Sequence, residues 1–153
     1  MMASPPLIKA LFWQLCKEGK VAEVREALLR EEGVNSKDEF ATSGLMWAVM
    51  NKHNSIVRLL LEKPTVDLNS TDNNGRAALH HSAIVDNFEA VQLLLANPRH
   101  KMANHEDDVG LTPVMLANKF ENMNALRMLV VHRSVDLDIW DLDTNLDGQR
   151  WVS

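Results

Sequence analysis

The chain has 153 residues, of which 46% are hydrophobic and 5% aromatic, so it is long enough to bury the core of one domain or one short solenoid. A net charge of −5 and a pI of about 5.6 argue against nucleic-acid binding, which needs clustered basic side chains. The single cysteine, Cys16, excludes an internal disulfide and is typical of a reducing compartment, so we expect a cytoplasmic or nuclear protein.

The first 29 residues predict a lead-in followed by two helices. Residues 1–6 (MMASPP) are expected to be flexible, because two consecutive prolines disfavour a helix interior. Apolar residues then recur at helical spacing over residues 7–29, with a break near Gly19. Lys9 interrupts the apolar run, which is therefore not a signal peptide, and no apolar stretch of the chain is long enough to span a bilayer. We expect no membrane partner.

Leucine-rich segments recur at a fixed interval farther along the chain. The segment that starts at Leu59 lies 34 residues before the one at Leu93, which lies 35 residues before the one at Met128. A period of this length indicates stacked structural repeats, each of which buries its apolar face only against its neighbours.

A turn followed by two helices fills each period. Gly75 and Gly110 each follow an aspartate by three residues, and glycine allows the left-handed backbone that a tight turn needs. Asp38 keeps the aspartate position in the preceding period, but Ala41 replaces the glycine, so we expect a looser turn there. The helices expected after these turns include residues 45–51, 55–62, 113–120 and 123–131.

The segments DNNGRAALHHSA (72–83) and DDVGLTPVMLA (107–117) resemble the turn and first helix of the ankyrin repeat. The resemblance covers residues 10–153 and implies an all-α, ankyrin-type solenoid of stacked helix-turn-helix repeats with short hairpin fingers. We therefore expect a lead-in at 1–6 and a single domain at 7–153. Its expected repeats are 7–37, 38–71, 72–106 and 107–144, with a partial fifth at 145–153.

The C-terminal end is expected to be incomplete. The step from Gly110 to Gly148 is 38 residues, so the last finger carries an insertion, and the final QRWVS stops before a further helix. An end repeat needs a polar outer side, whereas Met128, Leu129 and Trp151 are apolar. We expect a piece of a longer protein that is a monomer, or a weak homodimer through this uncapped end.

The resemblance implies that partners bind in the concave groove formed by the finger tips and the exposed sides of the first helices. Much of this surface is apolar, and an exposed apolar strip usually marks a protein interaction site, where aromatic residues and methionine are enriched. We expect a non-catalytic module that binds a protein or a peptide. The residues expected to contact the partner are Phe40, Trp47, Met50, Asn74, Arg76, His81, Ile84, Val85, Val109, Leu111, Lys119, Phe120 and Trp140.

Other interpretations of this surface stay open. Some of its residues could instead close gaps between neighbouring first helices, namely Trp47, Val85 and Leu116. Others could bind a small molecule or nucleotide, namely Trp47, Phe120 and Trp140 by stacking and Arg76 and Lys119 by charge. The domain could also regulate or scaffold a larger enzyme.

The sequence shows no pattern for catalysis, a cofactor or a metal. Cys16 falls on an apolar helix face, and a buried thiol is inert. The histidines are scattered over different repeat positions, whereas a zinc site needs three or four converging ligands, and His80 is expected to hydrogen-bond neighbouring turns. The acidic segment 141–148 departs from a calcium loop, because Gly148 stands at its eighth place instead of the sixth. We expect a solvated finger there.

Overall fold

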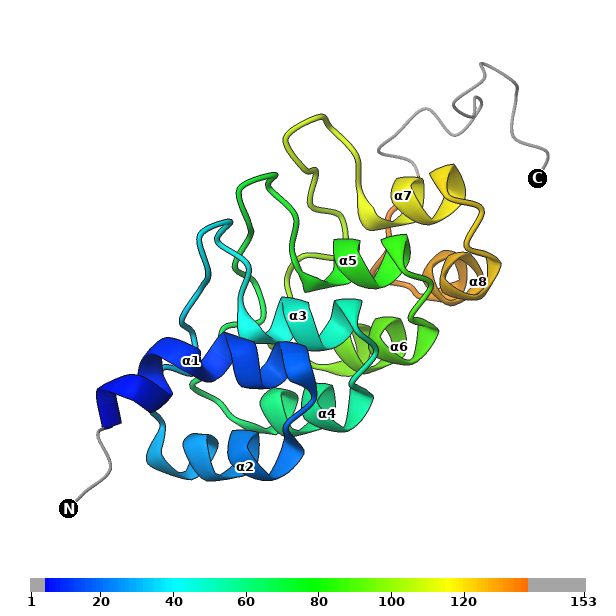
Figure 1. Cartoon of the computed structure of the whole chain (residues 1–153). Coiled ribbons are helices and arrows are strands. Elements are labelled where there is room, and N and C mark those ends of the chain that lie inside the picture. The colour runs from blue at the N-terminus through cyan, green and yellow to red at the C-terminus, as the bar shows by residue number, and fades with distance from the viewer. Residues whose placement is uncertain (1–4, 138–153) are drawn as a thin grey trace.

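A computed structural model of the chain describes residues 5–137, with side chains from Phe12 onward. Within residues 5–137, eight helices follow one another in pairs, and the segments between the pairs form fingers that project on one side (Figure 1). The helices are α1 (Pro5–Glu18), α2 (Val21–Arg30), α3 (Gly44–Met50), α4 (Asn54–Glu62), α5 (Ala78–Ile84), α6 (Phe88–Ala96), α7 (Pro113–Lys119) and α8 (Met123–Val131).

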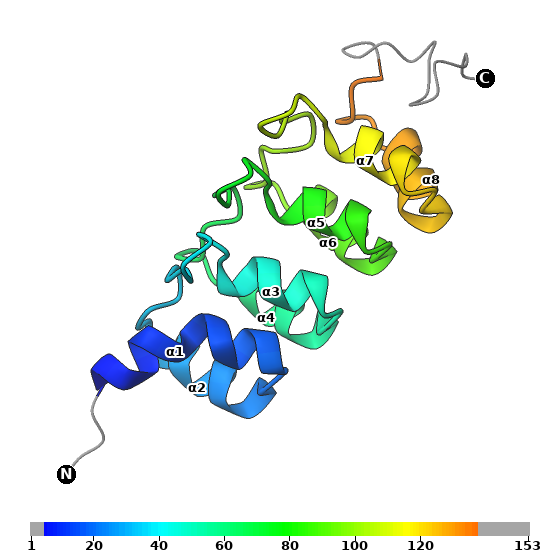
Figure 2. The ribbon, with the colours of Figure 1, turned by 45° about the horizontal axis from the view of Figure 1, so that its top comes forward.

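The helix pairs stack in register along one axis. The first helices form one layer, in which α1 packs on α3, α3 on α5 and α5 on α7. The second helices form the other layer in the same order, from α2 to α8, as Figure 2 shows from a second direction. The predicted all-α repeat solenoid is confirmed. None of the helices between residues 5 and 137 has both the length and the apolarity that crossing a bilayer requires.

Apolar residues at repeated helix positions build the core. The second helices α4, α6 and α8 each bury two adjacent residues and a third one turn later, which is the spacing that places side chains on one helix face. Removal of each such side chain from water stabilises the stack by about 1.5 to 3 kcal/mol for a leucine or isoleucine. These triplets are Ile56, Val57 and Leu60 in α4, Ala90, Val91 and Leu94 in α6, and Ala125, Leu126 and Leu129 in α8.

A polar side chain before each of the second helices α6 and α8 joins consecutive pairs. Asn87 Nδ2 donates to the carbonyl of Val49, 3.0 Å away, at the end of α3. Asn122 Nδ2 donates to the carbonyls of Ala83 and Ile84, each at 2.7 Å, at the end of α5. These bonds satisfy carbonyls that have no partner within their own helix, and they fix the rotation of one pair against the next.

Two local expectations were wrong. Helix α1 begins at Pro5, within the predicted lead-in of residues 1–6, because proline is tolerated in a first helical turn, where the N–H has no helical partner. The turn at Ala41 is as tight as the others: Ala41 N donates to Asp38 O at 3.0 Å, as Gly75 N does to Asp72 O. Ala41 adopts the left-handed conformation, with a φ of 61°.

Several predicted features lie outside the described residues. They are residues 1–4 of the lead-in, Trp140, the acidic segment 141–148, Trp151 and the partial fifth repeat at 145–153.

Gly44 provides a test of how closely the first two pairs pack. A Cβ atom at this position would lie 2.8 Å from Cys16 Sγ and 3.1 Å from a ring carbon of Phe12, both in α1. We predict that Gly44→Ala lowers the free energy of unfolding in urea by about 1 to 3 kcal/mol through overpacking. Adding Cys16→Ala, which removes the nearer atom, should restore part of the loss. An unchanged free energy of unfolding for Gly44→Ala would show that α1 and α3 are not packed this closely.

Candidate functional site

One aspartate organises each finger turn, a term used here for residues 38–42, 72–76 and 107–111. One carboxylate oxygen, Oδ1, accepts hydrogen bonds from the backbone N–H groups two and four residues later. The donors are Phe40 and Thr42 for Asp38, Asn74 and Arg76 for Asp72, and Val109 and Leu111 for Asp107, at 2.9 to 3.1 Å. Each carboxylate therefore holds its own turn closed, in the manner of an Asx turn.

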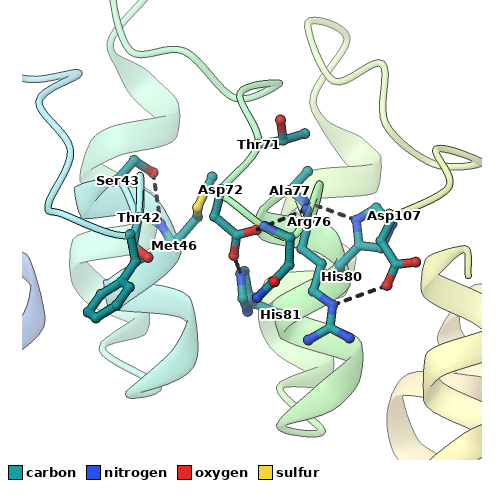
Figure 3. A network of polar contacts seen from close by, with 12 residues as sticks. Thr42, Ser43, Met46, Thr71, Asp72, Arg76, Ala77, His80, His81 and Asp107 are labelled. Atoms are coloured by element: carbon teal, nitrogen blue, oxygen red, sulfur yellow. Dashed lines mark hydrogen bonds and ion pairs between the residues drawn. The ribbon is translucent and has the colours of Figure 1, made fainter. Parts of the chain in front are cut away.

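In two repeats the second oxygen of the aspartate binds the first helix. Trp47 Nε1 donates to Asp38 Oδ2 at 2.9 Å. His81 Nε2 lies 2.7 Å from Asp72 Oδ2, and Figure 3 shows these two side chains facing each other. Both donors stand nine residues after the aspartate, one turn into the helix. A single carboxylate thus fixes the finger turn against the helix that follows it.

In the fourth repeat the second oxygen of the aspartate is bound by a donor from the preceding finger turn instead of from its own first helix. Leu116 stands nine residues after Asp107 and has no donor to offer. Arg76 Nε from the preceding finger turn donates instead to Asp107 Oδ2 at 3.1 Å (Figure 3). The Asp107 side chain is only 1% exposed, so this ion pair is shielded from solvent and links the two finger turns.

Hydrogen bonding keeps two of these carboxylates charged. Burial alone would raise the pKa of Asp72, but the bond from His81 and the N–H groups of Arg76 and Asn74 outweigh it and lower that pKa. Burial likewise disfavours the charge on Asp107, whose pKa is lowered by backbone N–H groups and by Arg76. Both groups are therefore ionised acceptors at neutral pH.

The tips of the fingers form a continuous row. Asn73 N donates to the carbonyl of Phe40, and Asp108 N donates to the carbonyl of Asn74, each at 3.0 Å. Figure 1 shows that the fingers lead into the N-terminal ends of α3, α5 and α7. The finger tips, together with the C-terminal ends of these three helices, are defined here as the finger face.

The finger face carries most of the predicted partner-contacting residues, and they differ in exposure. Phe40, Val109 and Phe120 are 61%, 74% and 48% exposed, so these large apolar side chains meet solvent. Asn74 and Lys119 are also exposed. The half-buried members are Trp47, Met50, Arg76, Ile84, Val85 and Leu111, and among them Met50, Ile84 and Leu111 also pack against the core.

Two predicted contact residues are fixed within the protein. His81 is 8% exposed and bonded to Asp72, so it supports the finger face from below and is not part of the exposed surface. Trp47 is bonded to Asp38, and Lys17 Nζ lies 4.3 Å from the centroid of its ring. This cation–π contact from α1 covers the indole, as expected for a residue that closes a gap between first helices.

The supporting role of Asp38, Asp72 and Asp107 was not predicted from the sequence. The constant spacing of nine residues between an aspartate and Trp47 or His81 was the available signal. Arg76 and Asp107 left no such signal, because their contact joins neighbouring repeats and depends on the stacking itself.

His80 has the structural role that we predicted. Its Nδ1 accepts from the N–H of Ala77 at 3.1 Å, and its Nε2 lies 2.7 Å from the carbonyl of His105. These partners require a neutral ring with the proton on Nε2. Burial lowers the pKa of His80 to about 4, so the ring binds no second proton at neutral pH.

The remaining reactive groups are placed for packing. Cys16 is fully buried, as predicted, and burial raises the pKa of its thiol to about 12, so it is not a nucleophile. Within residues 12–137 no three His, Cys, Asp or Glu side chains converge in a way that could hold a metal ion.

Comparison with known proteins gives consistent matches. A family model described as "Ankyrin repeats (3 copies)" matches residues 12–104. The chain is 31% identical over 128 residues, 80% of its length, to BTB/POZ domain-containing protein 1 of Schizosaccharomyces pombe, and 32% identical over 98 residues, 64% of its length, to Inversin of Gallus gallus. It is 36% identical over 56 residues, 37% of its length, to Osteoclast-stimulating factor 1 of Rattus norvegicus. The matched segments are 9%, 9% and 26% of these relatives, so the chain spans a small part of each.

The buried histidines predict how stability depends on pH. His80 and His100 have pKa values of about 4, below their ordinary value of 6.5, so between these values the unfolded chain binds protons that the folded chain does not. The free energy of unfolding should have its full value above pH 6.5. As the pH drops from there to 4, it should fall by about 1.4 kcal/mol per pH unit for each histidine. Urea unfolding at pH 7.5, 6 and 5 measures this slope, and His80→Gln should reduce it. An NMR titration of His80 with a midpoint near 6.5 would contradict the account.

Proposed function

The chain belongs to the ankyrin-repeat family, whose domains generally mediate protein–protein interaction, and we propose that it is a binding module that holds a protein or peptide partner on its finger face. Ankyrin-repeat domains are typically non-catalytic, and we assign this chain no reaction. Since its one cysteine is a buried thiol, we place it in a reducing compartment, the cytoplasm or the nucleus.

One observation carries the proposal: three large apolar side chains of the finger face are exposed to solvent. Phe40 and Val109 stand at the finger tips and Phe120 at the end of α7, and none of them packs against the hydrophobic core. A polar residue at any of these positions would cost the core nothing. Covering them with a partner would gain about 25 cal/mol for each Å² of apolar surface removed from water.

The negative charge of the finger tips favours a partner that carries basic residues beside the apolar residues that contact the finger face. Glu39 and Asp108 are exposed at the tips. The nearest guanidinium, on Arg76, is already neutralised by Asp107. A positively charged partner would therefore be attracted and oriented by the tips, which raises its association rate more than its final affinity.

The finger turns are already ordered in the free chain, and this order also supports the proposed binding. The finger turns are closed by Asp38, Asp72 and Asp107, and the tips are joined by backbone hydrogen bonds. Because these loops are already ordered, binding a partner would cost little of their conformational entropy. More of the free energy of the contacts would then appear as affinity.

Substitution of the exposed anchors tests the proposal. A phage-displayed peptide library selected on the native chain should yield apolar, basic peptides. We predict that Phe40→Asp and Phe120→Asp each weaken binding of a selected peptide at least tenfold by calorimetry, since each buries a charge in the interface. Their melting temperatures should change by less than about 2 °C, because both side chains stand outside the core.

Leu29→Asp is the matched control. Leu29 is 77% exposed but lies on α2, a second helix away from the finger face. It should leave the affinity unchanged. Peptides that bind the native chain and both finger-face variants equally well would place the binding site elsewhere and contradict the proposal.

A further inference from the structure

The Arg99 side chain lies at the junction between the second and third helix pairs. It is on the side of the solenoid that carries the loops following the second helices. Its guanidinium donates to four backbone carbonyls at and beyond the C-terminal end of α4. The acceptors are Leu61 and Lys63 for Nη2, at 3.1 and 3.0 Å, and Pro64 and Val66 for Nη1, at 3.2 and 2.9 Å. Carbonyls at a helix end have no helical partner and attract a cation, so this arrangement suits a guanidinium group.

Backbone hydrogen bonds identify the residue that stands in the place of Arg99 in the next repeat. Asn69 Nδ2 donates to the carbonyl of Arg99, and Asn104 Nδ2 donates to the carbonyl of Ser134, each at 2.9 Å. Asn69 Oδ1 accepts from the N–H of Lys101, and Asn104 Oδ1 accepts from that of Asp136. Ser134 is therefore the structural equivalent of Arg99, and its short side chain cannot reach the carbonyls at the end of α6.

A solvent-accessible cavity of about 760 Å³ lies where that guanidinium would be. Ser134 lines it together with the residues equivalent to the four acceptors of Arg99, which stand 34 positions after them: Leu95, Asn97, Pro98 and His100. The corresponding position at the first junction, Thr65, is also short, but Glu31 contacts it and pairs with Lys63 there.

We infer that this cavity is a binding site for a guanidinium group. The acceptors that Arg99 binds at one junction are repeated at the next, where no side chain within residues 12–137 donates to them and only the Asn97 carbonyl accepts a backbone bond, from the N–H of His100. His100 Nε2 is also buried and has no hydrogen-bond partner within residues 12–137, and it offers a further acceptor in the tautomer that carries the proton on Nδ1. Burial first, and then the charge of His132, lower the pKa of His100 to about 4, so its ring adds no positive charge at neutral pH.

The basic residues at the cavity do not favour an anion over this ligand. Lys101 and Arg133 line the cavity but are exposed, so their long side chains can direct their charges to solvent. The inner wall would present carbonyl oxygens to an anion, and carbonyls at the C-terminal end of α6 repel negative charge.

The guanidinium could come from a partner protein or from this chain. Arg150 is the one arginine among residues 138–153, which lie outside the described residues. The chemistry is the same in both cases, and the two sources differ in whether the cavity is free in the isolated chain.

Ethylguanidinium is a suitable probe, because at low millimolar concentration it presents the side-chain group without denaturing the protein. We expect saturable NMR shifts of backbone amides in residues 95–101 and 132–136, with no such response to ethylammonium, which lacks the planar fork of donors. A response in the unmodified chain would indicate a site free for a partner's arginine. A response only in Arg150→Ser would indicate that Arg150 supplies the group.

Substitution of Ser134 provides the control. Ser134→Arg should raise the melting temperature by about 2 to 4 °C, the shift expected when hydrogen bonds of a charged group are gained in a chain of this size, and should abolish the ethylguanidinium response. Ser134→Lys carries the same charge without the fork and should raise it less. In the converse variant, Arg99→Ser, the probe should also shift amides of residues 61–67 and restore part of the lost melting temperature.

Two results would overturn the inference. The first is no saturable response to ethylguanidinium at residues 95–101 in the unmodified chain or in Arg150→Ser. The second is a response of these amides to phosphate but not to ethylguanidinium, which would make the cavity an anion site. Because these residues lie away from the finger face, neither result bears on the proposed binding of a partner there.

Discussion

The carboxylate at the start of each finger turn is the interaction on which the finger face depends. One of its oxygens closes the turn through two backbone N–H groups, and the other is held by Trp47, His81 or Arg76. In two repeats this second bond joins the finger turn to its own first helix, and in the fourth repeat it joins two successive finger turns. Because the carboxylates of Asp72 and Asp107 are ionised and shielded from solvent, their hydrogen bonds are of the stronger, charge-assisted kind.

Repeated positions do not require repeated residues, as the second half of the solenoid shows. Trp47 and His81 donate to the aspartate of their own repeat, whereas Leu116 cannot, and Arg76 crosses from the preceding finger turn. In each of the three repeats a donor binds the second carboxylate oxygen of the finger-turn aspartate, although a different residue supplies it. The same comparison distinguishes Arg99, which fills its junction, from Ser134, which leaves a cavity. The polar interactions that are particular to this chain therefore lie at positions where its aligned repeats carry different residues.

The fold could be read from the sequence because periodicity is a property of many residues at once. The interval of 34 and 35 residues, the turn glycines and the leucine-rich second helices each gave the same solenoid. Local exceptions were harder to predict. Ala41 was expected to loosen its turn, but the bonds of Asp38 and the neighbouring tip hold it in the left-handed conformation. Pro5 was assigned to a lead-in, although a proline can begin a helix.

The finger face was predicted less completely, because exposure depends on contacts between repeats. The exposed positions of Phe40, Val109 and Phe120 followed from their places at tips and helix ends. The burial of His81 did not, since it requires the carboxylate of Asp72 beneath the finger turn. Trp47 likewise lies under Lys17, a residue 30 positions earlier in the chain. The sequence around Trp47 carries no information about this contact with α1.

The central claim is that the finger tips and the ends of the first helices together form the surface that holds a partner. An NMR map of backbone amides, recorded while a selected peptide is titrated into the chain, tests it most directly. The account predicts that the shifts cluster in residues 39–51, 73–85 and 108–120. Shifts confined to the second helices α4, α6 and α8 would contradict it.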